Sequence, residues 1–455
     1  MSSPTLVATQ KLHHPRLALI ALSLGIFIVL LDSTILNVAL PAIEHELHGS
    51  LESLQWTLNS YTLLFASLLL TGGALGDRYG VRRIFCLGLS IFTVASVLCS
   101  LAPSLAFLIA ARVIQGAGAA LLVPTSLSLI PHLFPETKER ANAVAVWSGI
   151  GALAIAAGPL LGGLLVDAFG WRSVFLVNLP CGLVALALTL TSIPTIHPQQ
   201  SRALDLPGQI FAIVACCALT YGLIEWGRVV LLLTVSAFIV TILAVGVFLT
   251  IEARSAHPML PLRLFLNWTV SATMLVGLIF QFSLFGTLFV FSLFFQQAYH
   301  YSAFQAGVAF LPQTAVGAFI LVFLSRWLLR WLRPEVALAI GMLCGMAGLL
   351  VMLLGIHTAT PVIVCGQVLM GCYAGFVASP LAAVVLGSVP KELAGIASAS
   401  LNAARQVGGV LGVALLGSAL GGHPLIEGVQ IALIMMAAAC LIGFFLSISS
   451  IQWHT

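Results

Sequence analysis

The sequence is poor in charged residues. Asp, Glu, Lys and Arg make up 7% of its 455 residues, whereas 60% are hydrophobic and the mean hydropathy is +1.12. A water-soluble domain of this composition would lack the polar residues that must cover its surface. The sequence therefore predicts an all-α polytopic membrane protein surrounded by a lipid bilayer. The formal net charge of +4 is too small to indicate a nucleic-acid partner.

The sequence also lacks the patterns typical of metal sites and hydrolytic active sites. None of its nine cysteines forms a Cys-x-x-Cys pair, and all nine lie in apolar stretches, so we interpret them as small core residues. Neither Gly-x-Ser-x-Gly nor His-Glu-x-x-His occurs. We therefore expect no enzymatic activity, no metal and no cofactor.

Apolar runs long enough to cross a bilayer as helices follow one another along the chain. The first begins at Arg16 and is too long for a signal-peptide core, so we expect it to be retained. Six runs, then two, then six predict 14 membrane-spanning helices in all. The predicted ranges are 16–41, 53–75, 84–101, 104–130, 142–166, 172–193, 207–226, 229–251, 267–298, 303–325, 335–356, 360–388, 394–419 and 426–451.

Polar links divide these spans into three regions. We predict an N-terminal six-helix bundle (1–193), a linker with two additional helices (194–266) and a C-terminal six-helix bundle (267–455). A weak internal repeat supports two parallel halves, because Arg112–Pro124 and Gln367–Pro380 carry similar Gln and Gly patterns in the same direction. Chance similarity between two apolar helices is the alternative.

The distribution of Lys and Arg predicts the orientation in the membrane. Outer segments would carry only Arg172 and Arg228, while Arg112 and Arg405 fall within spans. A wrong helix count would scramble this separation, so we expect a plasma (inner) membrane protein with both termini in the cytoplasm. The cytoplasmic segments carry Lys11, Arg16, Arg78, Arg82, Arg83, Lys138, Arg140, Arg202, Arg254, Arg263, Arg326, Arg330, Arg333 and Lys391.

A charged, glycine-rich segment separates the second and third spans. It reads Gly73-Ala-Leu-Gly-Asp-Arg-Tyr-Gly-Val-Arg-Arg83, and residues this polar between two spans must lie at a water interface. Gly76 and Gly80 permit a tight reversal there. A simple basic loop is the alternative to a functional segment. Its candidate functional residues are Gly73, Asp77, Arg78, Gly80, Arg82 and Arg83.

Three charged residues, Asp32, Arg112 and Arg405, fall clearly within predicted spans, where charge is costly and tends to be functional. Asp32 and Arg112 lie at the same depth, roughly 12 to 13 Å from the outer end of their spans at the α-helical rise, and are plausible partners. If Asp32 faces a cavity, movement between a desolvated and an Arg-paired environment would load and release a proton. A permanent ion pair that joins two helices, or an Asp that caps a helix break, is the alternative.

The fifth span carries Gly158, Pro159, Gly162 and Gly163. Proline removes a backbone donor and kinks the helix, while glycines at this spacing let a neighbouring helix approach closely. The segment could act as a hinge or a seal between helices. Ordinary small-residue packing is the alternative.

Four segments together resemble one known family. Gly73–Arg83 resembles the loop signature of the major facilitator superfamily, Gly158–Gly163 its antiporter motif, and Arg112-x-x-Gln115-Gly116-x-Gly118 its proton-coupling motif. Leu31–Pro41 resembles the first-helix signature of its drug:proton antiporters, and six plus two plus six helices is the plan of their fourteen-helix branch.

The resemblance implies two six-helix bundles that rock around a central cavity, with proton entry driving export. It implies that Asp77 and the nearby arginines stabilise one state across the bundle interface, that Arg112 assists proton transfer, and that Asp32 is a candidate proton or cation site. The sequence departs from the family pattern at Val81, where a basic residue is usual, and at Ala154, where another glycine is usual.

We expect the cavity to be lined by aromatic and amide side chains, which suit large, flat and weakly specific ligands. Core or lipid-facing packing is the alternative for each aromatic, and packing against carbonyls or Gln367 is the alternative for Arg405. The candidates are Gln55, Trp56, Asn59, Tyr61, Gln115, Phe280, Gln281, Phe285, Gln313, Tyr373, Asn402 and Arg405.

These features predict a monomeric, proton-coupled antiporter that exports amphipathic drugs or toxic small molecules by alternating access. A single buried carboxylate favours monovalent or neutral compounds over doubly charged cations. A proton-linked exporter of one endogenous metabolite is the alternative within transport, and a membrane-embedded enzyme or a passive channel is the alternative from another class.

Overall fold

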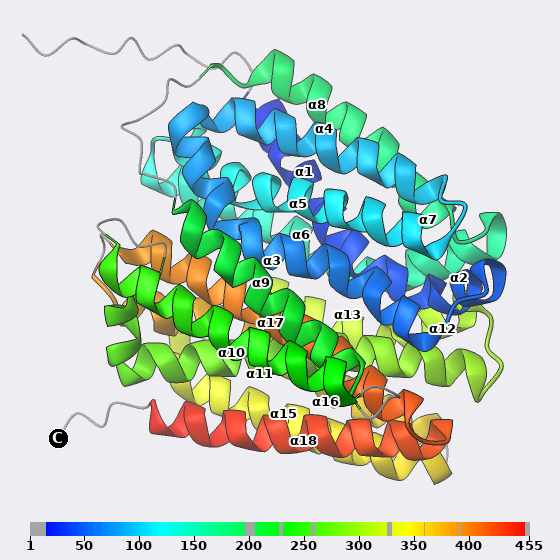
Figure 1. Cartoon of the computed structure of the whole chain (residues 1–455). Coiled ribbons are helices and arrows are strands. Elements are labelled where there is room, and N and C mark those ends of the chain that lie inside the picture. The colour runs from blue at the N-terminus through cyan, green and yellow to red at the C-terminus, as the bar shows by residue number, and fades with distance from the viewer. Residues whose placement is uncertain are drawn as a thin grey trace, which may run out of the picture.

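The computed structural model describes residues 15–195, 205–226, 231–255, 260–324, 330–358, 360–390 and 393–450. Within these ranges every regular element is helical (Figure 1). Thirteen helices are long and apolar enough to cross a membrane, and a bent pair at Ala303–Ala309 and Leu311–Leu324 makes a fourteenth when counted as one span. The predicted all-α polytopic fold is therefore confirmed.

The N-terminal bundle begins with a long broken helix and continues with five further spans. Its elements are α1 (Pro15–Ile35), η1 (Leu36–Ala39), α2 (Leu40–Leu47), α3 (Leu51–Tyr79), α4 (Val81–Ser100), α5 (Leu105–Leu133), α6 (Thr137–Phe169), α7 (Ser173–Leu176) and α8 (Asn178–Ser192).

The helices of the linker region and of the C-terminal region follow. The linker elements are α9 (Leu206–Ile224), α10 (Leu231–Arg254) and η2 (Leu262–Leu266). The C-terminal elements are α11 (Trp268–Gln297), α12 (Ala303–Ala309), α13 (Leu311–Phe319), η3 (Ile320–Leu324), α15 (Pro334–Thr358), α16 (Thr360–Gly387), α17 (Ala394–Gly421) and α18 (Leu425–Ser449).

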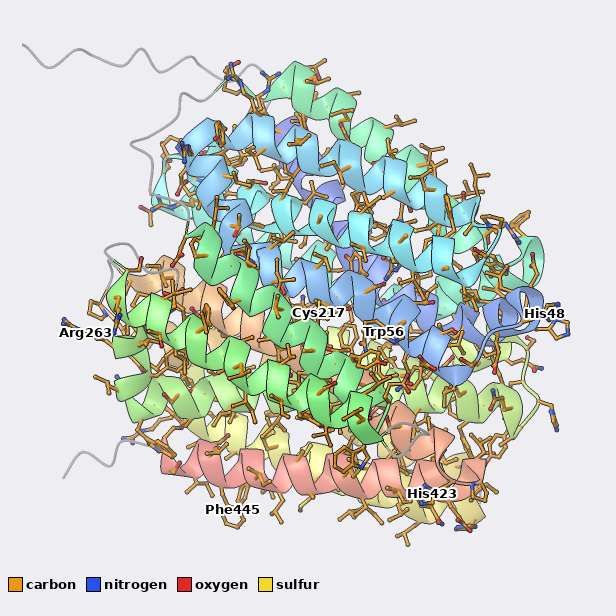
Figure 2. All side chains as sticks on the ribbon, viewed as in Figure 1. His48, Trp56, Cys217, Arg263, His423 and Phe445 are labelled. Atoms are coloured by element: carbon orange, nitrogen blue, oxygen red, sulfur yellow. The ribbon has the colours of Figure 1, made fainter. Side chains whose placement is uncertain are left out.

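The helices run between two polar ends of the molecule. Figure 2 shows His48 and His423 at one end and Arg263 at the opposite end, whereas Phe445 points outward from the side of α18. We call the first the Trp171 end, because Trp171 lies there beside Glu46. We call the second the Asp77 end, because α3 starts near His48 and its last turns, with Asp77, lie at the opposite end. The residues Lys11, Arg202, Arg228, Arg326 and Lys391, on which the orientation prediction also relies, lie outside the described residues.

Two local differences from the sequence prediction concern where helices break. Gly73–Tyr79 is not a loop but the last turns of α3, and Gly80, with φ of 97°, makes the reversal into α4 by itself. Only glycine adopts that backbone conformation without strain. The span predicted at 303–325 bends by 43° between α12 and α13, where Pro312 lacks the amide hydrogen that a continuous helix would use.

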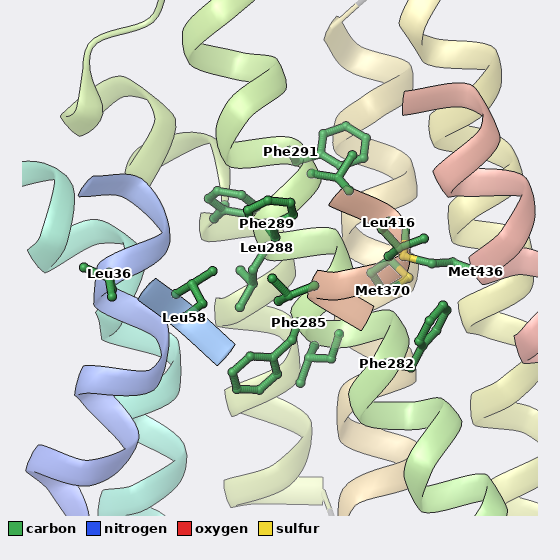
Figure 3. Close-up of a cluster of buried hydrophobic side chains, with 14 of the residues drawn as sticks. Leu36, Leu58, Phe282, Phe285, Leu288, Phe289, Phe291, Met370, Leu416 and Met436 are labelled. Carbon is green, nitrogen blue, oxygen red and sulfur yellow. The ribbon is translucent and has the colours of Figure 1, made fainter. Parts of the chain in front are cut away.

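The two bundles share a hydrophobic core at the Trp171 end. One buried cluster combines residues of both bundles, and Figure 3 shows Leu36 and Leu58 of the N-terminal bundle beside Leu288 of α11. The second cluster, which includes Phe65, Phe85 and other residues of the Asp77 half, contains N-terminal residues alone. The bundles are therefore pressed together at the Trp171 end.

The linker helix α9 connects the bundles along a diagonal (Figure 1). Near its start, the Gln209 amide donates a hydrogen bond of 2.5 Å to the carbonyl oxygen of Ser67 on α3. At its other end, the Ser418 hydroxyl of α17 donates a bond of 2.6 Å to the carbonyl oxygen of Leu223. The first end of α9 is thus bonded to one bundle and the last end to the other.

Pairs of helices within each bundle touch backbone to backbone at glycine. A Cβ atom added at Gly408 of α17 would overlap the carbonyl oxygen of Leu278 on α11. The adjacent Gly409 has more room, since the nearest atom to its added Cβ would be the Gln281 Cγ at 3.5 Å.

The neighbouring glycines provide a matched test of this packing. We expect Gly408→Ala to lower the thermal midpoint of the purified protein in detergent, because forcing α11 and α17 apart costs about 1 to 3 kcal/mol. Gly409→Ala should leave the midpoint unchanged or raise it slightly, because alanine is the better helix former. Equal midpoints for the two variants would contradict the close α11–α17 contact.

Candidate functional site

An ion pair buried in the N-terminal bundle forms the first part of the site. The Arg112 guanidinium of α5 pairs with the Asp32 carboxylate of α1, and each side chain is 1% exposed. The same carboxylate accepts hydrogen bonds from the amides of Gln115, at 2.9 Å, and Asn178, at 3.1 Å. Arg112 also donates to the Thr57 carbonyl oxygen at 3.2 Å. The network therefore joins α1, α3, α5 and α8.

Opposite charges at equal depth predicted the pairing of Asp32 with Arg112, but no sequence pattern points to Asn178 or Ser96 as further members of the network. Asn178 begins α8, and its amide bridges Asp32 and the hydroxyl of Ser96, at 3.0 Å. A lone Asn at the start of a span has no distinctive pattern, and only the packing of α8 against α1 and α4 reveals its role.

A cavity of about 1000 Å³ lies between the bundles and extends to the Asp77 end. Its walls come from α1, α3, α5 and α6 on one side and from α11, α13, α16 and α17 on the other. Asp77 and Asp205 line it near the helix ends, whereas Phe280 and Arg405 line it deeper, along the middle of α11 and α17. The predicted cavity residues that line it are Tyr61, Phe280, Gln281, Phe285, Gln313, Asn402 and Arg405.

The remaining cavity candidates do not line it. Gln55 donates to the carbonyl oxygens of Val413 and Ala414, at 3.0 and 2.9 Å, and so joins the bundles near the Trp171 end. Tyr373 is fully buried, with its hydroxyl 3.4 Å from the carbonyl oxygen of Ile279. Three further candidates also lie outside the lining: Trp56, Asn59 and Gln115.

Asp32 itself does not line the cavity, although its neighbour Ser33 does. Tyr61 also lines the cavity, and the Arg112 guanidinium carbon lies 4.2 Å from the centre of the Tyr61 ring. The Tyr61 hydroxyl is bonded to the Val29 carbonyl oxygen at 3.2 Å. In this conformation the carboxylate is therefore closed off, and proton exchange with the cavity would require the network to rearrange.

The Gly73–Arg83 segment lies at the wide end of the cavity. Asp77 is exposed and lines the cavity, as does Gly73. Arg82 donates to the carbonyl oxygen of Leu190 on α8 at 2.8 Å and to the hydroxyl of Thr195, just after α8, at 3.1 Å. Arg78 and Arg83 are exposed at the same end. Arg82 thus braces the N-terminal bundle in this conformation.

The Gly158–Gly163 segment of α6 forms contacts at the opposite end. A Cβ atom at Gly158 would overlap the Thr34 hydroxyl of α1, and one at Gly162 would lie 2.6 Å from the Ile35 carbonyl oxygen. On the neighbouring face, an added Cβ at Gly163 would overlap the Ala303 carbonyl oxygen of α12. Pro159 lies between these contacts, and α6 therefore touches both bundles through its backbone.

A carboxylate that the sequence analysis did not identify strengthens the contact between α6 and α12, which closes this end of the molecule. Asp167, near the end of α6, accepts hydrogen bonds from the backbone amides of Ala303 and Phe304, both at 3.1 Å. These amides start α12, where unpaired backbone donors attract negative charge. Asp167 could be found from sequence only if the contact between α6 and α12 were known.

The chain is similar in sequence to known proteins. The family model described as Major Facilitator Superfamily matches residues 22–413. Multidrug resistance protein Stp of Mycobacterium tuberculosis is 37% identical over 406 residues, which cover 89% of this chain and 75% of that protein. The methylenomycin A resistance protein of Streptomyces coelicolor is 35% identical over 431 residues, covering 93% of this chain and 90% of that protein.

Solved structures share the same architecture at low identity. A POT family transporter superposes with a TM-score of 0.71 at 13% identity, covering 95% of this chain and 96% of that one. The human organic anion transporter MFSD10 superposes with a TM-score of 0.67 at 17% identity, covering 95% and 99%. At these identities the likeness shows the fold alone. The family resemblance of the sequence motifs is confirmed: the chain belongs to the Major Facilitator Superfamily, and it is a multi-pass membrane transporter of small molecules rather than an enzyme.

Proposed function

We propose that the chain is a proton-coupled antiporter that exports amphipathic drugs or toxic small molecules by alternating access. The observation that carries the proposal is the buried Asp32–Arg112 pair beside a cavity of about 1000 Å³ that reaches one end of the molecule. Relatives named for multidrug resistance, for methylenomycin A resistance and for cephamycin export support drug export over other cargo.

The charge distribution supports the orientation that export requires. With the termini in the cytoplasm of a cell whose plasma membrane holds the protein, the Asp77 end faces the cytoplasm. The cavity then opens inward, and the Trp171 end, with its shared hydrophobic core, is the closed outer end. In this state a compound from the cytoplasm, or from the inner leaflet, enters beside Asp77 and reaches Phe280 and Arg405.

The proposed coupling step uses the geometry of the acid network. Protonation of Asp32 would remove the negative charge that neutralises Arg112, and the guanidinium would then need new partners. Its neighbour Tyr61 lines the cavity, so rearrangement of the pair would be transmitted to the cavity wall. The proton on Asp32 and the substrate would then favour different arrangements of the cavity wall. Proton binding from one side of the membrane would therefore promote release of the substrate on the other.

Reconstituted vesicles test both the transport and its coupling. We expect a panel of amphipathic compounds to release protons from the protein and to be transported in a manner that a protonophore abolishes. Several unrelated active compounds would support drug export, whereas a single active metabolite would support the specialised exporter. Transport that persists after the protonophore would point to a passive channel.

Asp32→Asn should reduce proton-linked export to background, because an amide of the same shape cannot exchange a proton. Membrane insertion should be retained, since it depends on the apolar length of the helices, although the uncompensated charge of Arg112 should lower the thermal midpoint. The control is Glu46→Gln, the same change in the exposed ion pair with Arg172, which should keep normal export. Wild-type proton release by the Asp32→Asn protein would assign the proton to a different residue.

The outer seal can be tested without any substrate. Asp167→Ala removes two hydrogen bonds to a charged acceptor, each of which contributes about 1.5 to 3 kcal/mol of stability. We therefore expect hydrogen–deuterium exchange of the amides in Ala303–Ala309 to become about tenfold faster or more. Glu427→Ala, which removes an exposed acid at the same end, is the control. Unchanged exchange in the Asp167→Ala protein would mean that the seal does not depend on this contact.

A further inference from the structure

The deep part of the cavity contains a positive charge that the coupling network does not use. Arg405 is the one cationic side chain among the described residues that line the cavity. It lies 11 positions after Ala394, where α17 starts, and thus about 16 Å along the helix from the Asp77 end. We propose that Arg405 forms a subsite for an anionic group, so that the exported amphiphiles include carboxylates. This inference rests on the proposed export function.

Arg405 is incompletely satisfied by the protein. One of its terminal nitrogens donates to the Gln281 side-chain oxygen at 3.3 Å, and its guanidinium carbon lies 5.4 Å from the centre of the Phe280 ring. Its Nε atom is buried and has no hydrogen-bond partner. Within the described residues no carboxylate lies in ion-pair contact with it. The amide and the ring offset only part of the cost of removing the guanidinium from water.

Comparison with Arg112 shows what is missing. Arg112, at 1% exposure, is neutralised by Asp32 and has further oxygen partners in Gln115 and Thr57. Arg405 has an amide and an aromatic ring but no counter-charge. The planar guanidinium donates two parallel hydrogen bonds to a carboxylate, which makes a ligand carboxylate the natural partner for an unpaired arginine.

A second side chain points to the same conclusion. Gln313 lines the cavity and is 2% exposed, yet its side-chain oxygen has no hydrogen-bond partner. Buried amide oxygens are usually hydrogen-bonded, so the Gln313 oxygen beside the cavity is an acceptor available to a ligand. A compound that carries both an anionic group and a hydrogen-bond donor could pair with both side chains, while Phe280 and Phe285 contact its apolar body.

The acids at the wide end do not oppose this assignment. Asp77 is exposed there, and Asp205 caps the start of α9 by accepting a hydrogen bond from the Gly208 amide at 2.9 Å. Charges in contact with water are screened within about 10 Å at ordinary ionic strength. The less hydrated surroundings of Arg405 screen charge far less, so its attraction dominates at the deep site.

Binding of two probes of nearly equal shape tests the subsite. The probes are 1-naphthaleneacetate, which carries a carboxylate, and 1-naphthaleneacetamide, which is neutral. Equilibrium dialysis against the protein in lipid nanodiscs, with empty nanodiscs subtracted, should show the carboxylate bound at least tenfold more tightly. Arg405→Gln should remove this preference and leave the affinity for the amide unchanged, whereas Arg405→Lys should retain part of it.

Arg172→Gln provides the matched control, because it removes the same charge at the Trp171 end, away from the cavity. It should leave the preference intact. Wild-type protein that binds both probes equally, or neither, would overturn the subsite, as would an equal loss of both affinities in a correctly folded Arg405→Gln protein. Proton-linked export of neutral or cationic compounds without any carboxylate preference would reject the subsite and leave the proposed function standing.

Discussion

A guanidinium held away from water costs free energy unless an opposite charge compensates it, and the N-terminal bundle is organised around this cost at Arg112. Asp32 supplies the counter-charge, and Gln115, Asn178 and Thr57 supply the remaining hydrogen bonds. Removing one member of a buried pair usually costs about 3 to 5 kcal/mol, because the other charge is left without compensation. The same interaction that holds α1 and α5 together therefore penalises any state in which Asp32 alone is neutral.

The contact surfaces between the bundles are built from small residues and backbone atoms. Gly163 of α6 meets the backbone of α12, and Gly307 of α12 meets the backbone of α6 at Pro159. Such surfaces fit closely in one arrangement and lose most of their contacts after a small displacement. Since Asp167 also acts at this end, closure is concentrated there, while the helices at the Asp77 end are separated by the cavity. The diagonal helix α9 is bonded to a different bundle at each end, so the linker belongs to the bundle junction and is not merely a connection.

Much of this architecture was predictable because the bilayer restricts the chain so strongly. Apolar length requires helices, and equal depth with opposite charge pointed to the partnership of Asp32 and Arg112. Helix rotation was not predictable, since it depends on the surfaces of neighbouring helices. Gln55 was expected in the cavity but faces α17 instead, and Tyr373 is enclosed within its own bundle. The role of Asn178 likewise depends on packing that the sequence alone does not reveal.

The two arginines inside the spans show how differently the bundles treat the same chemical group. In the N-terminal bundle the charge is neutralised internally, and the resulting network is closed from the cavity. In the C-terminal bundle, Arg405 lines the cavity with only Gln281 and Phe280 to accommodate it. A charge that costs free energy in the empty protein is stabilised when a partner of opposite sign arrives, so the cost of leaving it unpaired contributes to discrimination between ligands. The Asp32–Arg112 pair thus belongs to one bundle and the ligand-facing Arg405 to the other. A movement of one bundle relative to the other therefore affects the surroundings of both.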